Sequence, residues 1–229
     1  MGHYRGRVTE IRFELNRHLE AFIACPSQAV PHAGQYLLAS DPDDPSASLG
    51  SSLFLAGQTS QGFWAVPSMP VTWKPGANLN LAGPLGHGFN LPANVQRLGL
   101  VGLGDTLARL MPVIQQFAAS QGSMTLFSDL PLPEAPAALE AYPLASLVDA
   151  LDWPDFIAFD LSLERVSELR DTLKLPMNSG LPCPAQALII SSMPCAGMAQ
   201  CGACALPARR GWKLVCEDGP VFDLQSIKW

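Results

Sequence analysis

The chain has 229 residues, enough for one or two domains, and hydrophobic residues make up 48% of it. Charged residues are only 15% and the formal net charge is −6, which argues against a disordered chain and against a nucleic-acid-binding protein. The 21 prolines also argue against a helical bundle or a coiled coil. The composition therefore predicts a turn-rich fold with a large buried or partner-covered surface.

Two long stretches without charge, residues 45–73 and 175–208, are each long enough to cross a membrane. Their prolines would leave backbone groups without partners in lipid, so we predict no membrane span. The N-terminus runs into a strand-like pattern with no apolar signal segment. We expect a cytoplasmic protein whose uncharged surface is covered by another subunit.

The first 94 residues show short alternating or apolar runs separated by turn signals, as is typical of antiparallel strands. This spacing predicts a small antiparallel barrel of about six strands. The runs expected to form strands are Arg5–Phe13, Leu19–Ala24, Gln35–Ala39, Ser52–Ala56, Phe63–Val66, Val71–Trp73 and Asn78–Ala82.

Beyond residue 94, strand-like and helix-like segments alternate, which predicts a parallel α/β domain. One helix is expected at Leu107–Ser120, capped by Asp105 or Thr106 and kinked at Pro112. A second is expected at Ser162–Lys174. The expected strands are Arg97–Val101, Ser123–Ser128, Asp155–Phe159 and Ala185–Ser191.

We expect three parts in chain order. Residues 1–94 form the barrel, which is of the flavin-binding type. Residues 95–192 form the α/β domain, which is of the nucleotide-binding type. Residues 193–229 form a segment that binds an iron–sulfur cluster.

That last segment holds four of the six cysteines, with the spacing C-x5-C-x2-C-x11-C. In a cytosolic chain such a group favours a metal site over a disulfide framework. The spacing is close to the plant-type pattern C-x4-C-x2-C…C, in which one loop and a separate strand wrap a 2Fe–2S cluster. We therefore expect such a cluster, with zinc and disulfides as the alternatives. The four expected ligands are Cys195, Cys201, Cys204 and Cys216.

The other two cysteines, Cys25 and Cys183, lie in apolar surroundings and are expected to be small buried side chains. Three cations follow the cysteine loop, Arg209, Arg210 and Lys213. We expect them to offset the negative charge of the cluster.

The order of barrel, α/β domain and cysteine cluster resembles the ferredoxin-reductase superfamily. Three stretches resemble the electron-transfer subunit of type B dihydroorotate dehydrogenase: residues 33–36 (AGQY), 83–89 (GPLGHGF) and 215–223 (VCEDGPVFD). Residues 195–204 resemble that family's three-cysteine loop. Gly102 and Gly104 stand where the family has its glycine-rich nucleotide turn.

The resemblance implies an oxidoreductase subunit that carries FAD and a 2Fe–2S cluster. It would relay electrons between NAD and a catalytic partner subunit that binds FMN and oxidises dihydroorotate, a step of pyrimidine biosynthesis. The four clustered cysteines are then the cluster ligands, and Gly102 and Gly104 belong to the nucleotide site. We expect a subunit of a hetero-oligomer rather than a stand-alone enzyme, with no catalytic residue of its own.

The flavin motifs of the family do not carry over. Residues 51–56 replace its Arg-Pro-x-Ser segment, and no Arg or Lys occurs between His18 and Lys74. The negative charges of a pyrophosphate would have to be met by such groups. Residues 65–70 replace the family's Gly-Thr turn.

This sequence also differs from the family in the motifs that bind the nicotinamide nucleotide. Position 107 is Leu where the dinucleotide pattern has its third glycine, and residues 159–161 (Phe-Asp-Leu) replace a Cys-Gly-Pro segment. Two interpretations stay open. The chain is either a reductase subunit that uses FAD and NAD, or a flavin-free iron–sulfur relay or docking subunit of a larger complex. A structural subunit stabilised by a zinc ion is a third and weaker interpretation.

Overall fold

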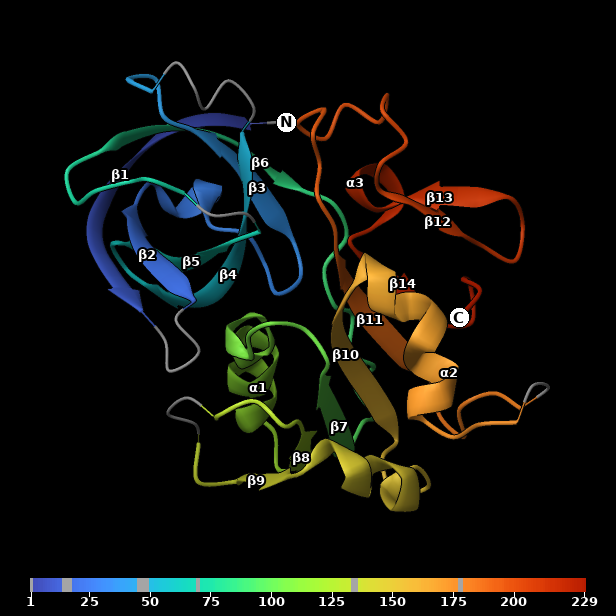
Figure 1. The fold of residues 1–229 in the computed structure, drawn as a ribbon. Helices are drawn as coiled ribbons and strands as arrows, with labels where there is room; N and C mark the ends of the chain where they lie inside the picture. The colour runs from blue at the N-terminus through green and yellow to red at the C-terminus, as the bar shows by residue number, and fades with distance from the viewer. Residues whose placement is uncertain (1, 14–17, 45–49, 69–70, 133–135, 177–178) are drawn as a thin grey trace.

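The computed structural model describes residues 2–13, 18–44, 50–68, 71–132, 136–176 and 179–229. It confirms the predicted fold class, an antiparallel barrel followed by a parallel α/β sheet and a C-terminal cysteine-bearing segment (Figure 1). No helix among these residues has the length and apolar character that a membrane crossing requires.

Six strands of the described chain close the barrel, in the order β1-β2-β5-β4-β3-β6, and all neighbours are antiparallel. Alternate residues face inward, so that Val8, Ile23, Leu37 and Leu53 are fully buried in one apolar cluster. The strands are β1 (Gly2–Phe13), β2 (Leu19–Ala24), β3 (Tyr36–Ser40), β4 (Ser51–Thr59), β5 (Gly62–Pro67) and β6 (Asn78–Leu85), with a 3₁₀ turn η1 (Ser27–Ala29).

The strand predicted at Val71–Trp73 is wrong. These residues form an irregular segment, although Trp73 is only 8% exposed and packs with the barrel cluster. The six strands already close the barrel, so this apolar run fills space beside the sheet instead of pairing within it. A short apolar run does not by itself distinguish these two roles.

The sheet has the order β14-β11-β10-β7-β8-β9 and is parallel except for β14. The chain goes from β7 to β8 on one side and returns to β10 on the other, so β7 and β10 flank the switch point of the sheet. Ligands of open α/β sheets bind at the carboxyl ends of such strands. The strands are β7 (Arg97–Gly102), β8 (Ser123–Phe127), β9 (Leu139–Tyr142), β10 (Phe156–Ser162), β11 (Ala185–Ile190) and β14 (Val221–Asp223).

The helices of this half are shorter than predicted. The first begins as a 3₁₀ turn, η2 (Ala108–Leu110), and continues as α1 (Met111–Ala118). The kink predicted at Pro112 is wrong, because Pro112 stands in the first turn of α1, where no backbone donor is needed. The segment predicted at Ser162–Lys174 is mostly a 3₁₀ turn, η4 (Leu163–Glu168), followed by one turn of α-helix, α2 (Leu169–Thr172). A further 3₁₀ turn, η3 (Leu144–Ala150), follows β9.

The C-terminal segment adds a small hairpin, β12 (Ala205–Pro207) and β13 (Trp212–Leu214), and a one-turn helix, α3 (Val215–Asp218). It then returns to the sheet as β14, which pairs with β11. One apolar cluster joins all three predicted parts, since Tyr36 of the barrel and Phe159 of the sheet share it with Cys216. The predicted domain limits at residues 94 and 192 stay a prediction.

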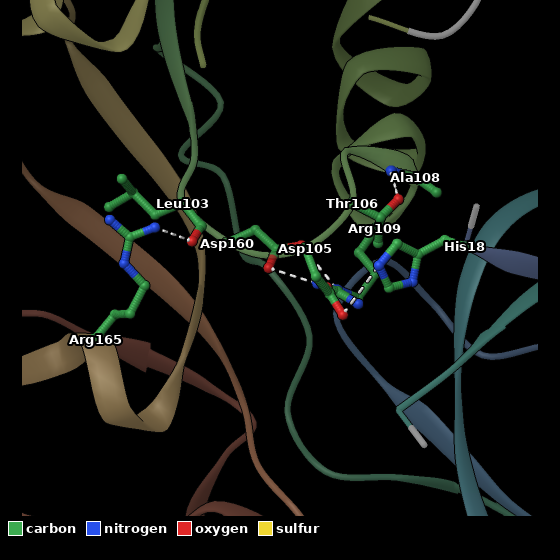
Figure 2. A network of polar contacts seen from close by, with 8 residues as sticks. All are labelled: His18, Leu103, Asp105, Thr106, Ala108, Arg109, Asp160 and Arg165. Carbon is green, nitrogen blue, oxygen red and sulfur yellow. Dashed lines mark hydrogen bonds and ion pairs between the residues drawn. The ribbon is translucent and has the colours of Figure 1, made fainter. Parts of the chain in front are cut away.

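The barrel and the sheet meet at a network of charged side chains (Figure 2). Arg109, which is 1% exposed, donates from Nε and Nη2 to the two oxygens of Asp160, at 2.9 and 3.2 Å. Asp160 is fully buried at the carboxyl end of β10. Arg109 also pairs with Asp105, and the Nε2 atom of His18, from the barrel side, lies 3.5 Å from the same carboxylate.

In this network the ion pair of Arg109 and Asp160 is buried away from water. Burial lowers the pKa of Arg109, but Asp160 and Asp105 raise it by more, so the guanidinium stays charged. Its Nη1 atom is buried without a hydrogen-bond partner among the described residues. Removing one member of a buried pair leaves the other charge uncompensated, which costs far more than losing an exposed pair.

We expect Asp160→Ala to lower the free energy of unfolding by about 3–5 kcal/mol. Asp105→Ala should cost under about 1 kcal/mol, because Asp105 is half exposed and its pair is screened by water. The double variant Arg109→Met/Asp160→Leu should recover most of the loss, since it removes both charges together. Chemical denaturation of the four proteins measures this, and equal losses for Asp160→Ala and Asp105→Ala would contradict it.

Candidate iron–sulfur site

The hairpin β12–β13 holds two of the predicted ligands side by side. Cys204 precedes its first strand and Cys216 follows its second, and the N–H of Val215 donates to the carbonyl of Cys204 at 3.0 Å. The two sulfurs lie 3.4 Å apart, and the residues are 1% and 6% exposed. Burial, followed by the neighbouring Cys204, raises the pKa of Cys216 to about 12. The Cys216 thiol therefore resists ionisation until a cation binds beside it.

The other two predicted ligands lie in the preceding loop. Cys195 is half-buried and Cys201 is exposed. Backbone N–H groups of Gln200, Cys201 and Met198 and the thiol of Cys201 act on the Cys195 sulfur and lower its pKa to about 6, with Gln200 contributing most. The loop has unusual backbone angles, since Ala196, Gly197, Ala199 and Gly202 have φ between 49° and 72°. That conformation turns successive N–H groups toward the sulfurs.

The four predicted ligands thus form two contacting pairs, Cys195 with Cys201 and Cys204 with Cys216. Within the part of the chain that the structure describes, no three His, Cys, Asp or Glu side chains gather closely enough to hold one metal ion. The Cys195 sulfur is near enough to the second pair that its charge contributes to the raised pKa of Cys216.

Tyr36 connects these cysteines to the barrel. Its hydroxyl donates to the carbonyl of Cys216 at 3.0 Å, and the side chain is 1% exposed. Burial, followed by Cys216, Cys204 and Cys195, raises its pKa well above the ordinary value, so the hydroxyl keeps its proton. A Cβ on Gly197 would lie 3.2 Å from the same hydroxyl, so the loop approaches Tyr36 closely.

The three stretches that resemble the dihydroorotate dehydrogenase subunit meet beside this site. The N–H of His87, in residues 83–89, donates to the carbonyl of Gly219 at 2.7 Å. The side-chain amide of Gln35 donates to the carbonyl of Gly86 at 3.1 Å. Gly86 has φ +73°, and a Cβ there would lie 2.6 Å from the Gly219 carbonyl oxygen. This loop therefore fixes the tail that follows Cys216.

Sequence reasoning singled out the four cysteines as candidate ligands but did not single out Tyr36. The only sequence signal for Tyr36 was its place at the end of the AGQY stretch. Its contact with Cys216 could not be predicted from the sequence, because the two residues are 180 positions apart. Cys25 and Cys183 stand apart from the site, and both are partly buried. Burial raises the pKa of each to about 11, which makes them poor nucleophiles.

Gly102 and Gly104 lie at the carboxyl end of β7, at the switch point and away from the cysteines. Their close neighbours are side chains of the same molecule. A Cβ on Gly102 would lie 2.3 Å from Leu107, and one on Gly104 would lie 2.6 Å from an oxygen of Asp160. Figure 2 shows Asp105, Arg109 and Asp160 gathered at this turn, and Arg165 donating to the carbonyl of Leu103 at 2.7 Å.

Comparison with protein families gives one match in this region. Residues 191–228 match the iron–sulfur cluster binding domain of dihydroorotate dehydrogenase B, and this stretch contains all four predicted ligands. No curated protein matches the sequence.

Solved structures with this fold are distant in sequence. A chain of the NADH-dependent reduced ferredoxin–NADP oxidoreductase is 17% identical with a TM-score of 0.74, covering 98% of this chain and 90% of that one. The ferredoxin reductase of carbazole 1,9a-dioxygenase is 19% identical with a TM-score of 0.59, covering 77% and 67%. The ferredoxin–NADP⁺ reductase of Plasmodium falciparum is 8% identical with a TM-score of 0.53, covering 77% and 90%. Residues 191–228 are therefore similar to the iron–sulfur cluster binding domain of dihydroorotate dehydrogenase B, and the chain that carries them has a ferredoxin-reductase-like fold.

Proposed function

We propose that this chain is an electron-transfer subunit whose redox group is a 2Fe–2S cluster held by Cys195, Cys201, Cys204 and Cys216. The observation that carries the proposal is the arrangement of these cysteines in two contacting pairs inside the matched domain. Each iron of such a cluster takes two protein ligands, so two thiolate pairs suit it. A structural zinc instead needs four ligands around one ion.

The residues around the sulfurs suit a cluster with one buried and one exposed side. Cys204 and Cys216 lie in the apolar core beneath Tyr36, which keeps water from that pair. Cys201 is exposed, and the N–H of Ala203 lies 3.5 Å from its sulfur. Hydrogen bonds to the sulfurs and burial tune the potential of a bound cluster, which would carry one electron at a time. The exposed side offers a short path to a partner.

The residues do not fit the FAD and NAD that the resemblance implies. Ala56 and Val66 of the barrel pack directly against Ala108 of η2, so side chains of the two halves fill that contact. Cationic side chains for a pyrophosphate do not occur in residues 19–73 of the sequence. Residues 69–70, which belong to the second replaced flavin motif, lie outside the described residues.

The switch point is equally unsuited to a dinucleotide. Arg109 and Asp160 neutralise each other there, and Leu107 and Asp160 occupy the space beside the two glycines. With its charge met by Asp160 and Asp105, Arg109 leaves no net positive charge there for a phosphate. We therefore favour the flavin-free relay over the reductase subunit.

A one-cluster carrier without a substrate site needs a second protein that performs the chemistry. By resemblance that partner is a catalytic oxidoreductase subunit, and dihydroorotate is its candidate substrate. Within the uncharged stretch 175–208, the exposed part of the cysteine loop, which includes Met198 and Cys201, is the surface we expect the partner to cover.

Cys204→Ser should remove the visible absorbance and the bound iron, because a serine oxygen is a poor substitute for a thiolate ligand. Cys183→Ser is the matched control: it also changes a partly buried cysteine, but one away from the site, and should retain both signals. Iron analysis and visible spectra of the purified proteins measure this. Full iron and colour in Cys204→Ser would refute the proposed ligation.

The protein purified without oxygen should hold about two irons per chain and no flavin, even after incubation with FAD. Dithionite should bleach its visible absorbance, whereas NADH alone should not, because the switch point offers no nicotinamide site. Iron, zinc and released flavin are assayed on the same sample. One bound FAD per chain with bleaching by NADH would restore the reductase interpretation, and zinc in place of iron would support a structural role.

A further inference from the structure

The turn of the β12–β13 hairpin lies at the opposite end of the hairpin from the cysteine pair. In Figure 1 the hairpin extends away from the barrel beside α3. Its turn, residues 208–211, is closed by the N–H of Ala208 donating to the carbonyl of Gly211 at 3.0 Å. The C-terminal residues brace it, since Ala208 bridges to Ile227 and the N–H of Arg209 donates to the carbonyl of Ser226 at 3.1 Å. The backbone of the turn is therefore fixed.

This fixed turn presents an aromatic side chain to solvent. Trp212 is 72% exposed, the highest value among the large hydrophobic side chains of the described residues. It lies in β13 opposite Pro207, so its backbone is held by the strand pairing. Trp and Arg are the side chains most enriched at the energetic centres of protein interfaces.

The same turn gathers positive charge on an acidic protein. Arg209 and Arg210 are exposed, and Lys213 lies in β13. Residues 205–216 contain these three cations and no acidic residue, whereas the whole chain has a net charge of −6. Arg209 also lines a cavity of about 370 Å³ with Arg170 and Lys228, which extends the basic surface behind the turn.

Offsetting the charge of a cluster does not account for this arrangement. The arginines sit at the turn, while Cys204 and Cys216 sit at the base, where the two residues after Cys216 are the acidic Glu217 and Asp218. An exposed Trp would also contribute nothing to such an offset. Both features are accounted for by a partner surface that has carboxylates and an apolar pocket.

We propose that residues 208–213 are a docking surface for an electron-transfer protein with an acidic face. This inference rests on the proposed function, because a relay exchanges electrons with a second protein besides the catalytic subunit. Trp212 enters an apolar pocket of the partner, and Arg209 and Arg210 pair with its carboxylates. The charges steer the encounter, and the rigid turn keeps the ordering cost low.

The test is binding of an acidic plant-type ferredoxin, used as the probe and measured by calorimetry with the purified protein. Wild type should bind it at low salt and lose at least about tenfold in affinity when salt is raised to about 0.2 M. Trp212→Ala and Arg209→Glu/Arg210→Glu should each weaken binding at least about tenfold. The matched control Lys74→Glu/Lys174→Glu makes the same charge change at two exposed sites away from the turn and should bind as wild type does.

Basic cytochrome c is the second probe, and its binding should not weaken in the turn variants. Wild type that fails to bind ferredoxin at low salt would overturn the proposal, and so would turn variants that bind it like wild type. Sedimentation that shows a self-associated wild type and monomeric turn variants would assign the surface to a second copy, which also overturns it. Iron content of the same samples reports on the proposed cluster separately, so failure of the docking surface and failure of the proposed function are distinguishable.

Discussion

The contact between two buried thiols, those of Cys204 and Cys216, is the constraint on which the C-terminal part of the structure depends. At 3.4 Å and within the core, two thiolates would repel each other without screening by water. Burial and the neighbouring sulfur accordingly raise the pKa of Cys216 to about 12. Metal binding reverses this preference, because a coordinated thiol loses its proton. The hairpin, α3 and Tyr36 together keep this pair in place.

The barrel contributes to the position of the cysteine pair through its own residues, without a flavin. Tyr36 comes from β3, and its hydroxyl holds the backbone of Cys216. The loop after β6 holds Gly219, three residues beyond that cysteine. The barrel thus positions the cysteine pair through contacts at both of these points. These contacts do not involve a flavin, so the barrel serves as a scaffold for the cysteines through its own residues.

The sequence predicted best what depends on local pattern. Alternation located the barrel strands, and Leu19–Ala24 has the same bounds in the structure. Spacing identified four cysteines as the candidate ligands, but not their pairing, which depends on a hairpin of two three-residue strands. Contacts between residues that are far apart in the sequence could not be predicted from it. Tyr36 and Cys216 are 180 residues apart, and Arg109 and Asp160 are 51 apart. Neither pair leaves a periodic signal.

The two glycines of the nucleotide-type turn are required here by packing within the protein. Gly102 and Gly104 follow the pattern of a nucleotide turn, in which glycine lets the backbone approach a pyrophosphate. Here glycine is still required, because Leu107 lies against the first and Asp160 and Arg109 lie against the second. The buried ion pair occupies the switch point and ties the sheet to the barrel through Asp105 and His18. This internal packing by itself accounts for glycine at both positions.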